Sequence, residues 1–336
     1  MEQTAVILVN VGTPDSPSVP DVRKYLSQFL NDRRVIDLPW LLQKVLVNLV
    51  IVPFRAPKSA KLYQQLWDEK GSPLLYHSQR ATEKLQLRMG EKWQIFNAMR
   101  YGRPSLENVL EQIKNKAFKR IIILPLFPQY ASATTGAVSE FILSKISRWN
   151  TIPELHLINH FHDHPAFIEA FALQAAKYKV HIWDHILFSF HGLPLQQIQK
   201  VHPGRDCQDC LCKTESIAEG KLCYQAACYE TARLISLKAG ISNDRYSVSF
   251  QSRLNKNWMT PFTDKMLIQK ANEGVKNILV FAPSFVADCL ETKIEIEKDY
   301  QLLFREHGGE NLQLVESLND HDYWIGGLEQ IITSQN

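Results

Sequence analysis

The 336-residue sequence lacks several features that would place it in a special class of protein. Its N-terminus, MEQTAVILVNVG, has no basic segment before an apolar run, so we expect no signal peptide and a cytoplasmic protein. The formal net charge is only +3, which gives no electrostatic case for a nucleic-acid partner. With 45% hydrophobic and 22% charged residues, the composition excludes disordered, collagen-like and coiled-coil chains. We therefore expect a globular protein of one large domain or two linked ones.

The sequence also has no uninterrupted apolar run of the length that a bilayer span needs. The stretch that comes nearest, LPWLLQKVLVNLVIVPF at residues 38–54, carries its apolar residues at helical spacing. Two interpretations stay open. It is either a core helix or an exposed apolar lip that contacts a membrane or an apolar ligand.

Cysteine is scarce except in one place. Of the six cysteines, five fall within residues 207–228 and the sixth is Cys289; the five are Cys207, Cys210, Cys212, Cys223 and Cys228. In a reducing compartment such a cluster favours metal binding over disulfides. The spacing C-x2-C-x-C-x10-C-x4-C matches no standard zinc ribbon, and four thiolates suit either tetrahedral zinc or a [2Fe-2S] cluster. Free buried thiols are the third interpretation.

Short apolar runs rich in β-branched residues alternate with amphipathic segments of helix length. The clearest runs are residues 5–11, 120–127, 185–190, 246–250 and 278–281. Runs of this length and composition are typical of buried parallel strands. Their alternation with helices over the whole length predicts an α/β fold.

The two halves of the sequence resemble each other. AVILVNVGTP (5–14) aligns with HILFSFHGLP (185–194), FNAMRYGRP (96–104) with SVSFQSRLN (247–255), and KRIIILPLFPQY (119–130) with KNILVFAPSF (276–285). Three matched pairs in the same order predict two similar, doubly wound, Rossmann-like domains, with boundaries at 1–160 and 161–336 and a Cys-rich insertion at about 201–228. Ligands of such sheets bind beyond the carboxyl ends of the strands, where NVGTP, FPQY, FHGLP and APSF all lie.

His191 directly follows one of these predicted strands and precedes Gly192. A titratable, metal-binding imidazole at a strand end is a candidate for proton transfer or metal ligation. Further along, Glu291, Glu295 and Asp299 recur at every fourth position and so share one face of a predicted helix. The stripe is either a solvated surface or a row of carboxylates that leads protons or a divalent cation into a cleft.

Other polar and aromatic residues lie near predicted strand ends. Arg100, Tyr101, the hydroxyl-rich segment Tyr130 to Thr135 and Trp258 could orient a flat, anionic ligand. A group of four histidines, His156, His160, His162 and His164, precedes Pro165 and favours surface or helix-capping roles over metal binding.

Five motifs together resemble the ferrochelatase family over essentially the whole chain. They are RYGRP, FPQYASATTG, SFHGLP, QSRLNKNW and, at residues 288–292, DCLET. The resemblance implies a chelatase fold of two Rossmann-like domains and a lyase that inserts Fe²⁺ into protoporphyrin IX to give haem b, with release of two protons. It also implies a position in the cytoplasm or at the periphery of the inner membrane.

The resemblance assigns roles to individual residues. His191 and Glu291 match the family's histidine and glutamate at the iron substrate, and Glu295 and Asp299 continue the family's acidic path. Positions that match the porphyrin-binding motifs are Arg100, Tyr101, Tyr130, Thr134, Thr135, Trp258 and Asp288. Residues 38–54 match the pocket lips that contact the membrane in some members. The cysteine insertion resembles the internal [2Fe-2S] site of some bacterial members, held by four of the five cysteines.

Alternatives to this function stay open in the sequence. The chain could be a coproporphyrin ferrochelatase or a chelatase for another tetrapyrrole or metal. A different class is a non-catalytic iron–sulfur or haem-binding protein. If the chain is a ferrochelatase, its expected partners are a porphyrin, ferrous iron and a membrane edge.

Overall fold

The computed structural model describes residues 3–116, 118–201 and 222–334, and its contacts divide the chain into two compact units. Unit 1 comprises Met1–Phe127, Ala131–His160 and Asp320–Asn336, and unit 2 comprises Pro128–Tyr130 and Phe161–Asn319. The sequence placed the second domain at 161–336. The structure differs from that boundary at the C-terminal end, because Asp320–Asn336 group with unit 1.

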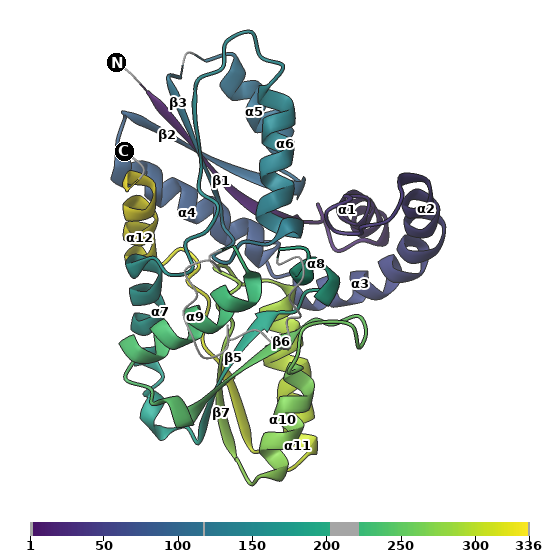
Figure 1. Cartoon of the computed structure of the whole chain (residues 1–336), viewed down its shortest axis with the longest axis vertical. Coiled ribbons are helices and arrows are strands. Elements are labelled where there is room, and N and C mark those ends of the chain that lie inside the picture. The colour runs from purple at the N-terminus through teal and green to yellow at the C-terminus, as the bar shows by residue number, and fades with distance from the viewer. Residues whose placement is uncertain (1–2, 117, 202–221, 335–336) are drawn as a thin grey trace. The chain divides into compact units, whose positions relative to one another are not determined.

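Unit 1 contains a four-stranded parallel sheet with the strand order β2-β1-β3-β4 (Figure 1). The strands are β1 (Thr4–Thr13), β2 (Trp93–Gly102), β3 (Arg120–Pro125) and β4 (Glu154–Leu157). In β1 the residues from Ala5 to Val9 are almost completely buried, as expected for a central parallel strand covered on both faces. On one face of this strand, Ala5, Ile7 and Val9 belong to a core of aliphatic and aromatic side chains that also come from β3 and from the helices α5 (Leu106–Lys114) and α6 (Ala137–Ile146).

The helices of unit 1 follow the strands in the chain. They are α1 (Val19–Leu30), α2 (Trp40–Val45), the π-helix η1 (Leu46–Ile51), α3 (Val52–Leu66), α4 (Pro73–Met89), α5 (Leu106–Lys114), the π-helix η2 (Ser132–Gly136), α6 (Ala137–Ile146) and the C-terminal α12 (Asp322–Thr333). The last of these packs in unit 1 against α4, where Lys84 Nζ lies 2.9 Å from Asp322 and Arg88 pairs with Glu329.

Unit 2 contains a second four-stranded parallel sheet, with the order β6-β5-β7-β8. The strands are β5 (His185–His191), β6 (Tyr246–Gln251), β7 (Asn277–Phe281) and β8 (Asn311–Leu314). The helices are α7 (Pro165–Lys177), η3 (Val180–Ile182), α8 (Leu195–Gln199), α9 (Tyr224–Lys238), η7 (Asn243–Arg245), α10 (Thr263–Asn272), the π-helix η8 (Glu291–Tyr300) and α11 (Gln301–Glu306).

The two sheets have the same strand order, which confirms the predicted α/β fold with two related halves. In each sheet the first strand of the unit lies between the second and the third, and the fourth lies outside the third. The three matched sequence pairs are β1 with β5, β2 with β6 and β3 with β7. The remaining strands, β4 and β8, were not predicted, because each has only four residues and is less buried than the central strands.

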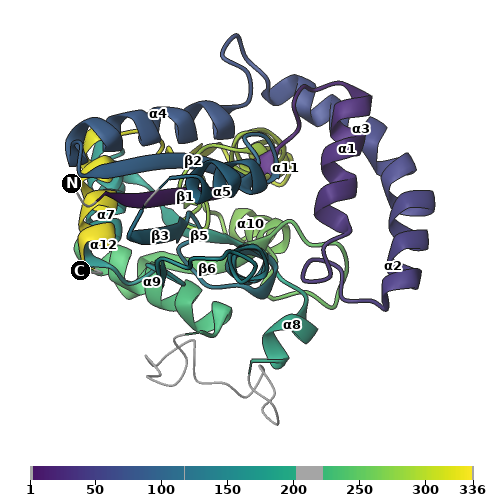
Figure 2. The ribbon, with the colours of Figure 1, turned by 90° about the horizontal axis from the view of Figure 1, so that it is seen from above.

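The helices α2, η1 and α3 form one continuous helical run from Trp40 to Leu66. Figures 1 and 2 both show α1 beside α3, with α2 farther from the strands of unit 1. One side of the run is buried against α1, through Val47, Val52, Ala56 and Ala60. The core-helix interpretation of 38–54 is therefore wrong for most of its apolar side chains, which are exposed: Leu38, Trp40, Leu41, Leu42, Val45, Leu46, Leu49, Val50 and Phe54.

This helical run is also longer than the sequence analysis assumed. With 27 residues, the run is long and apolar enough to cross a membrane, by length and composition alone. The apolar pattern seen in the sequence, at residues 38–54, is shorter than the run. In its most apolar window only 22% is buried within the protein, so it is not an ordinary core helix.

The carboxyl end of β1 depends on a glycine. Gly12 has φ of +110°, and a Cβ at this position would lie 1.7 Å from the backbone oxygen of Tyr101 on β2. No other residue could keep the two strands this close. Gly12 therefore fixes the strand end that carries the NVGTP motif beside the RYGRP motif of β2.

Candidate active site

His191 is the last residue of β5 and lies at the carboxyl end of the unit 2 sheet. Its ring Nδ1 lies 2.6 Å from the carbonyl oxygen of Gly192. Because a carbonyl oxygen only accepts, Nδ1 carries the proton of the neutral ring and Nε2 keeps its lone pair. The imidazole is half-buried between two aromatic rings, with its centroid 6.3 Å from that of Trp258 and 6.2 Å from that of Phe285.

Trp258 lies near His191 because the backbone segments that follow β5 and β6 pair with each other. Pro194 pairs with Trp258 in an isolated bridge, and Met259 N donates to Leu193 O at 3.0 Å. A Cβ at Gly192 would lie 2.9 Å from Gln251 O and 3.5 Å from the Trp258 ring. Close packing at Gly192 therefore holds the HGLP and QSRLNKNW motifs together.

Gln251 connects the strand of His191 with the acidic helix. It pairs with His191 in the β5–β6 register, and its Oε1 accepts a hydrogen bond from Ser189 Oγ at 2.6 Å. With its orientation set in this way, Nε2 donates to Glu291 O at 3.1 Å and to Glu295 Oε2 at 3.2 Å. The structure thus brings His191, Glu291 and Glu295 to the same end of the unit 2 sheet.

The acidic stripe lies on η8, which is a π-helix rather than an ordinary α-helix. Ten-residue π-helices are rare, and π-helical segments are frequent at functional sites. Glu291 is its first residue, and its carboxylate interacts with the thiol of Cys289. Burial, followed by the charge of Glu291, raises the pKa of Cys289 well above its usual range, so this cysteine stays a neutral thiol.

Glu295 is bound by four groups of the protein itself. Besides Gln251, Ser252 donates to its carboxylate through both the backbone N–H, at 2.8 Å, and the hydroxyl, and Tyr300 Oη donates at 2.8 Å. Ser252 has φ of +61°, a left-handed conformation that is unusual for a residue other than glycine. Glu295 therefore anchors the turn that follows β6 to the π-helix.

Asp299, the third member of the stripe, is the most exposed of the three. Partial burial, together with the negative charge of Glu295, raises the pKa of Asp299 above its usual value. A carboxyl group with a raised pKa takes up a proton more readily than an ordinary surface aspartate.

Asp288 is 8% exposed, and its carboxylate is occupied within unit 2. Its Oδ2 accepts from Asn319 Nδ2 at 3.0 Å, its Oδ1 accepts from Thr292 Oγ1 at 3.3 Å, and its backbone N–H donates to Asn319 Oδ1 at 2.9 Å. These bonds make Asp288 a support for the start of the π-helix rather than a free ligand group.

In unit 1, Arg100 and Tyr101 share a partner that the sequence analysis missed. Arg100 Nη2 lies 2.7 Å from Asp32 Oδ2, and Tyr101 Oη donates to the same oxygen at 2.9 Å. Arg100 Nε also donates to Ala137 O at 3.2 Å. Burial, followed by the charge of Asp32, raises the pKa of Tyr101 above its usual value. In this conformation both predicted ligand groups are bound to protein atoms.

The hydroxyl-rich segment is divided between the units. Tyr130 belongs to unit 2 and is half-buried, whereas Thr134 and Thr135 lie in η2 of unit 1. Thr134 Oγ1 donates to Ala131 O at 3.4 Å, and Thr135 is fully buried. In this conformation Thr135 has no surface with which to contact a substrate.

Of the cysteines in the insertion, Cys207, Cys210 and Cys212 lie outside the described residues. Cys223 precedes the first residue of α9 and is buried. Cys228 lies within α9 on its buried face, with no exposed surface. Burial, and then the neighbouring Cys228, raise the pKa of Tyr224 well above its usual value. Cys228 is therefore buried within unit 2, next to Tyr224 on the same helix.

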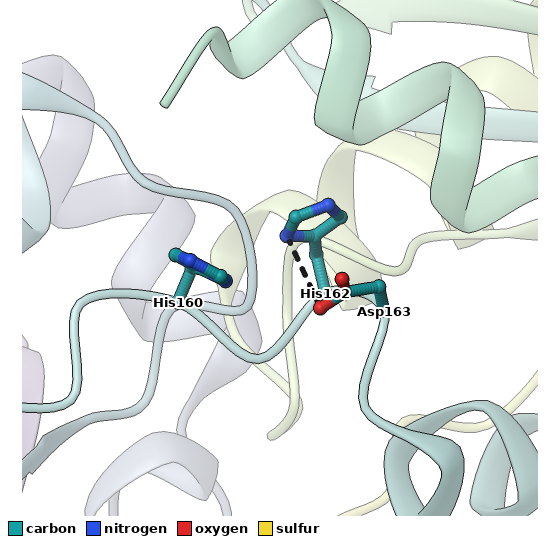
Figure 3. A group of neighbouring side chains, drawn as sticks. All are labelled: His160, His162 and Asp163. Atoms are coloured by element: carbon teal, nitrogen blue, oxygen red, sulfur yellow. Dashed lines mark ion pairs between the residues drawn. The ribbon is translucent and has the colours of Figure 1, made fainter. Parts of the chain in front are cut away.

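The four histidines before α7 have different surroundings. His164 caps α7 by accepting from Ala166 N at 3.2 Å, which confirms the predicted capping role, and His156 pairs with Glu154 at the surface of β4. The prediction of a surface position is wrong for His162, which is 1% exposed and lies 3.4 Å from Glu230. Candidate ligand atoms of His160, His162 and Asp163 lie within 4.8 Å of one another (Figure 3).

Sequence reasoning missed the residues that hold the site rather than those that form it. Asp32 and Tyr224 are outside the motifs that were used, and a single polar residue near the end of a helix carries no distinctive pattern. Ser284 lies in the strand-end motif APSF, but it was not singled out there. Gln251 and Ser252 stand inside the motif QSRLNKNW, so their position was available. Their bonds to the π-helix could not be deduced, because those contacts join segments about 40 residues apart.

Two solved structures share the fold at 11% sequence identity. SirB from Bacillus subtilis with Fe³⁺ superposes with a TM-score of 0.51, covering 99% of this chain and 97% of its own. A multi-domain protein of Deinococcus radiodurans, described as structurally similar to chelatases, gives a TM-score of 0.54 over 100% of this chain and 56% of its own. The fold is therefore that of the chelatase class.

Sequence comparisons narrow this class to one family. The Ferrochelatase family model matches residues 3–336. The ferrochelatase of Legionella pneumophila (strain Lens) is 42% identical over 334 residues, which cover 98% of each chain. The ferrochelatase of Coxiella burnetii (strain Dugway 5J108-111) is 40% identical, over 97% of this chain and 92% of its own. The chain belongs to the ferrochelatase family.

Proposed function

We propose that this chain inserts Fe²⁺ into protoporphyrin IX, giving haem b and releasing two protons. As a member of the ferrochelatase family it is an enzyme, a lyase that inserts ferrous iron into a porphyrin. The observation that carries the proposal is the match to this family over residues 3–336, which includes His191 and Glu291.

His191 is the proposed metal ligand and proton acceptor. Its Nδ1–H is committed to Gly192 O, so Nε2 is the atom available to an incoming cation or to a pyrrole proton. Nitrogen metalation is slow in a flat macrocycle, because the lone pairs lie in the ring plane. An enzyme accelerates it by gripping the ring periphery and distorting the ring, so that the nitrogens point out of plane.

Glu291 is the proposed second group at the metal, and Asp299 the group that exchanges protons with solvent. Glu291 stands at the start of the π-helix and Asp299 at its more exposed end, where its raised pKa suits proton uptake. Glu295, between them, is bound by four donors and serves to position the path. Carboxylate oxygens and an imidazole suit loose binding of a first-row divalent cation.

Protoporphyrin is the proposed substrate over a more carboxylated ring because the two rings beside the His191 imidazole are apolar. Trp258 and Phe285 flank the imidazole. For the substrate's periphery we propose Arg100, Tyr101, Tyr130 and Thr134. The bonds of Arg100 and Tyr101 to Asp32 would then rearrange or be shared when a propionate binds.

An anaerobic assay with two porphyrins tests this function. The protein is mixed with Fe²⁺ and either protoporphyrin IX or coproporphyrin III, and loss of porphyrin fluorescence is followed. We expect turnover with protoporphyrin at a higher kcat/KM. A preference for coproporphyrin would establish the alternative substrate. A haem or cluster spectrum without turnover on either ring would favour the non-catalytic class.

We also propose a [2Fe-2S] cluster on Cys207, Cys210, Cys212 and Cys223. We propose Cys228 as the spare cysteine, because it has no exposed surface and lies inside α9 next to Tyr224. Cys223 is also buried, but it stands before the helix start, beside the insertion. Four thiolates would hold the two irons, and the bound cluster would supply a redox-active group. Anaerobic purification of wild type, Cys223→Ser and Cys228→Ser, with iron and sulfide analysis, tests the assignment. Loss of iron from Cys228→Ser but not from Cys223→Ser would reverse it.

The exposed apolar surface of residues 38–54 is the proposed membrane contact, with the protein in the cytoplasm at the inner membrane. Exposed apolar patches of this kind mark interaction sites. Arg55 and Lys58, also exposed, follow directly after Phe54 and would attract anionic lipid headgroups. Nucleic acid is not among the proposed partners.

A further inference from the structure

The backbone of His191 extends beyond the sheet on one side. On the β6 side, pairing continues to the end of the strand, where His191 stands opposite Gln251. On the β7 side, pairing stops at Phe188 and Phe281. The backbone N–H and C=O of a strand residue both point to the same side, so His191 needs other partners where β7 has ended.

Two side chains from elsewhere in unit 2 supply these partners. Tyr224, the first residue of α9, donates its hydroxyl to His191 O at 2.7 Å. Ser284, in the loop after β7, accepts from His191 N through its Oγ at 3.4 Å. The two hydroxyls lie 3.1 Å apart, so they form one connected group.

We infer that Tyr224 and Ser284 are positioning residues for His191 and hold its peptide groups so that Nε2 keeps a fixed direction. The inference rests on the proposed role of His191. The ring is fixed at Nδ1 by Gly192 O, which belongs to the same short stretch of backbone. Rotation of that backbone would therefore turn the whole imidazole. A displacement of about 1 Å at a reacting group can lower a rate by roughly a hundredfold.

Tyr224 is well suited to this task because it is rigid. Its side chain is 6% exposed and packs at the start of α9, next to the buried Cys228. A buried phenol has few rotamers to visit, so its hydroxyl can define the position of a carbonyl better than a water molecule can.

The test uses Tyr224→Phe, which removes only the hydroxyl. We expect kcat for metal insertion to fall roughly tenfold to a hundredfold, with KM for the porphyrin changed less than about twofold. Zn²⁺ affinity, measured by calorimetry without porphyrin, should fall together with kcat. The matched control is Tyr178→Phe, which deletes the hydroxyl of a half-buried tyrosine of unit 2, the one that accepts from Glu316 N at 3.0 Å. It should lower the unfolding free energy but leave kcat and Zn²⁺ affinity unchanged.

A pair of substitutions at Ser284 keeps the test independent of the folding of Tyr224→Phe. Ser284→Ala should lower kcat, and Ser284→Thr, which keeps the hydroxyl, should restore most of it. Wild-type kcat and Zn²⁺ affinity in both Tyr224→Phe and Ser284→Ala would overturn the inference. If wild type itself does not insert iron, the proposed function fails. In that case, a Zn²⁺ affinity lower than wild type in both His191→Ala and Tyr224→Phe would still support the positioning of His191 by Tyr224. A Zn²⁺ affinity equal to that of wild type in Tyr224→Phe would reject it.

Discussion

Arg100 Nη2 lies 2.7 Å from Asp32 Oδ2 in unit 1, and the two side chains are only 18% and 10% exposed. Tyr101 donates to the same carboxylate oxygen. A single aspartate at the end of α1 therefore orders the two residues of the RYGRP motif that match porphyrin-binding positions. The motif alone would have placed both groups free in a pocket.

Asp32→Asn should lower the free energy of unfolding by about 2 kcal/mol, because the amide group of Asn opposes the buried guanidinium. Urea unfolding measures the change. The control is Glu83→Gln, which removes the exposed Arg80–Glu83 pair of the same unit and should cost less than about 0.5 kcal/mol. Equal decreases in the unfolding free energy of the two variants would show that the Asp32–Arg100 pair stabilises the protein no more than an exposed ion pair does.

His191→Ala should lower the rate of iron insertion at least about a hundredfold, since it removes the proposed ligand and proton acceptor. Porphyrin binding, measured by fluorescence, should persist. His181→Ala, which alters an exposed histidine of the same unit, is the control and should retain wild-type turnover. Near-normal turnover in His191→Ala would remove this residue from the mechanism.

Glu291→Gln and Glu295→Gln should distinguish the proposed role of Glu291 in metal insertion from the structural role of Glu295. Glu291→Gln should reduce insertion with little change in unfolding free energy. Glu295→Gln should lower the unfolding free energy by about 2 kcal/mol, because one of its oxygens becomes a donor that faces other donors. Glu297→Gln, which breaks a partly exposed pair with Lys293 on the same helix, provides the matched control. A stable but inactive Glu295→Gln would instead make Glu295 a direct participant.

His185 predicts a pH dependence of stability. Burial, followed by the charge of Lys270, lowers the pKa of His185 to about 4 from 6.5, although Glu273 opposes the shift. Between these values the unfolded chain binds more protons, so stability falls as the pH decreases from 6.5 toward 4. Over this pH range the protonation of His185 lowers the free energy of unfolding by about 3 kcal/mol. Urea unfolding of His185→Gln at pH 7, 5.5 and 4.5 should show a shallower slope than wild type. Identical slopes would contradict the assignment.

Trp40→Glu combined with Phe54→Glu should reduce binding to vesicles of phosphatidylethanolamine and phosphatidylglycerol at least about tenfold, because each side chain contributes apolar area to the contact. Co-sedimentation measures the bound fraction. Leu87→Glu alters an exposed leucine on α4 and should leave binding unchanged. Equal reductions in both proteins would indicate a nonspecific charge effect rather than a defined lip.

The sequence predicted the parts of the fold that depend on local pattern. Continuous apolar runs revealed β1, β3, β5 and β7 because central parallel strands are buried on both faces. The run that revealed β6 lies at the edge of its sheet, where the last four residues of the strand are nevertheless buried. Edge strands such as β8 escaped detection, since their burial alternates and they are short. For the candidate site, the motifs predicted His191 and Glu291, which lie at the same end of the unit 2 sheet. The bonds of Asp288 to Asn319 and of Arg100 to Asp32 depend on tertiary packing and leave no trace in local spacing.

The C-terminal helix has a consequence for how this chain is made. Helix α12 packs against α4 in unit 1, although the whole of unit 2 is translated between them. While the ribosome synthesises residues 161–319, Lys84 and Arg88 on α4 therefore lack their ion-pair partners Asp322 and Glu329, which have not yet been made. Domains usually complete folding in the order of synthesis. Here unit 1, whose synthesis begins first, can complete its folding only after the whole of unit 2 has been synthesised.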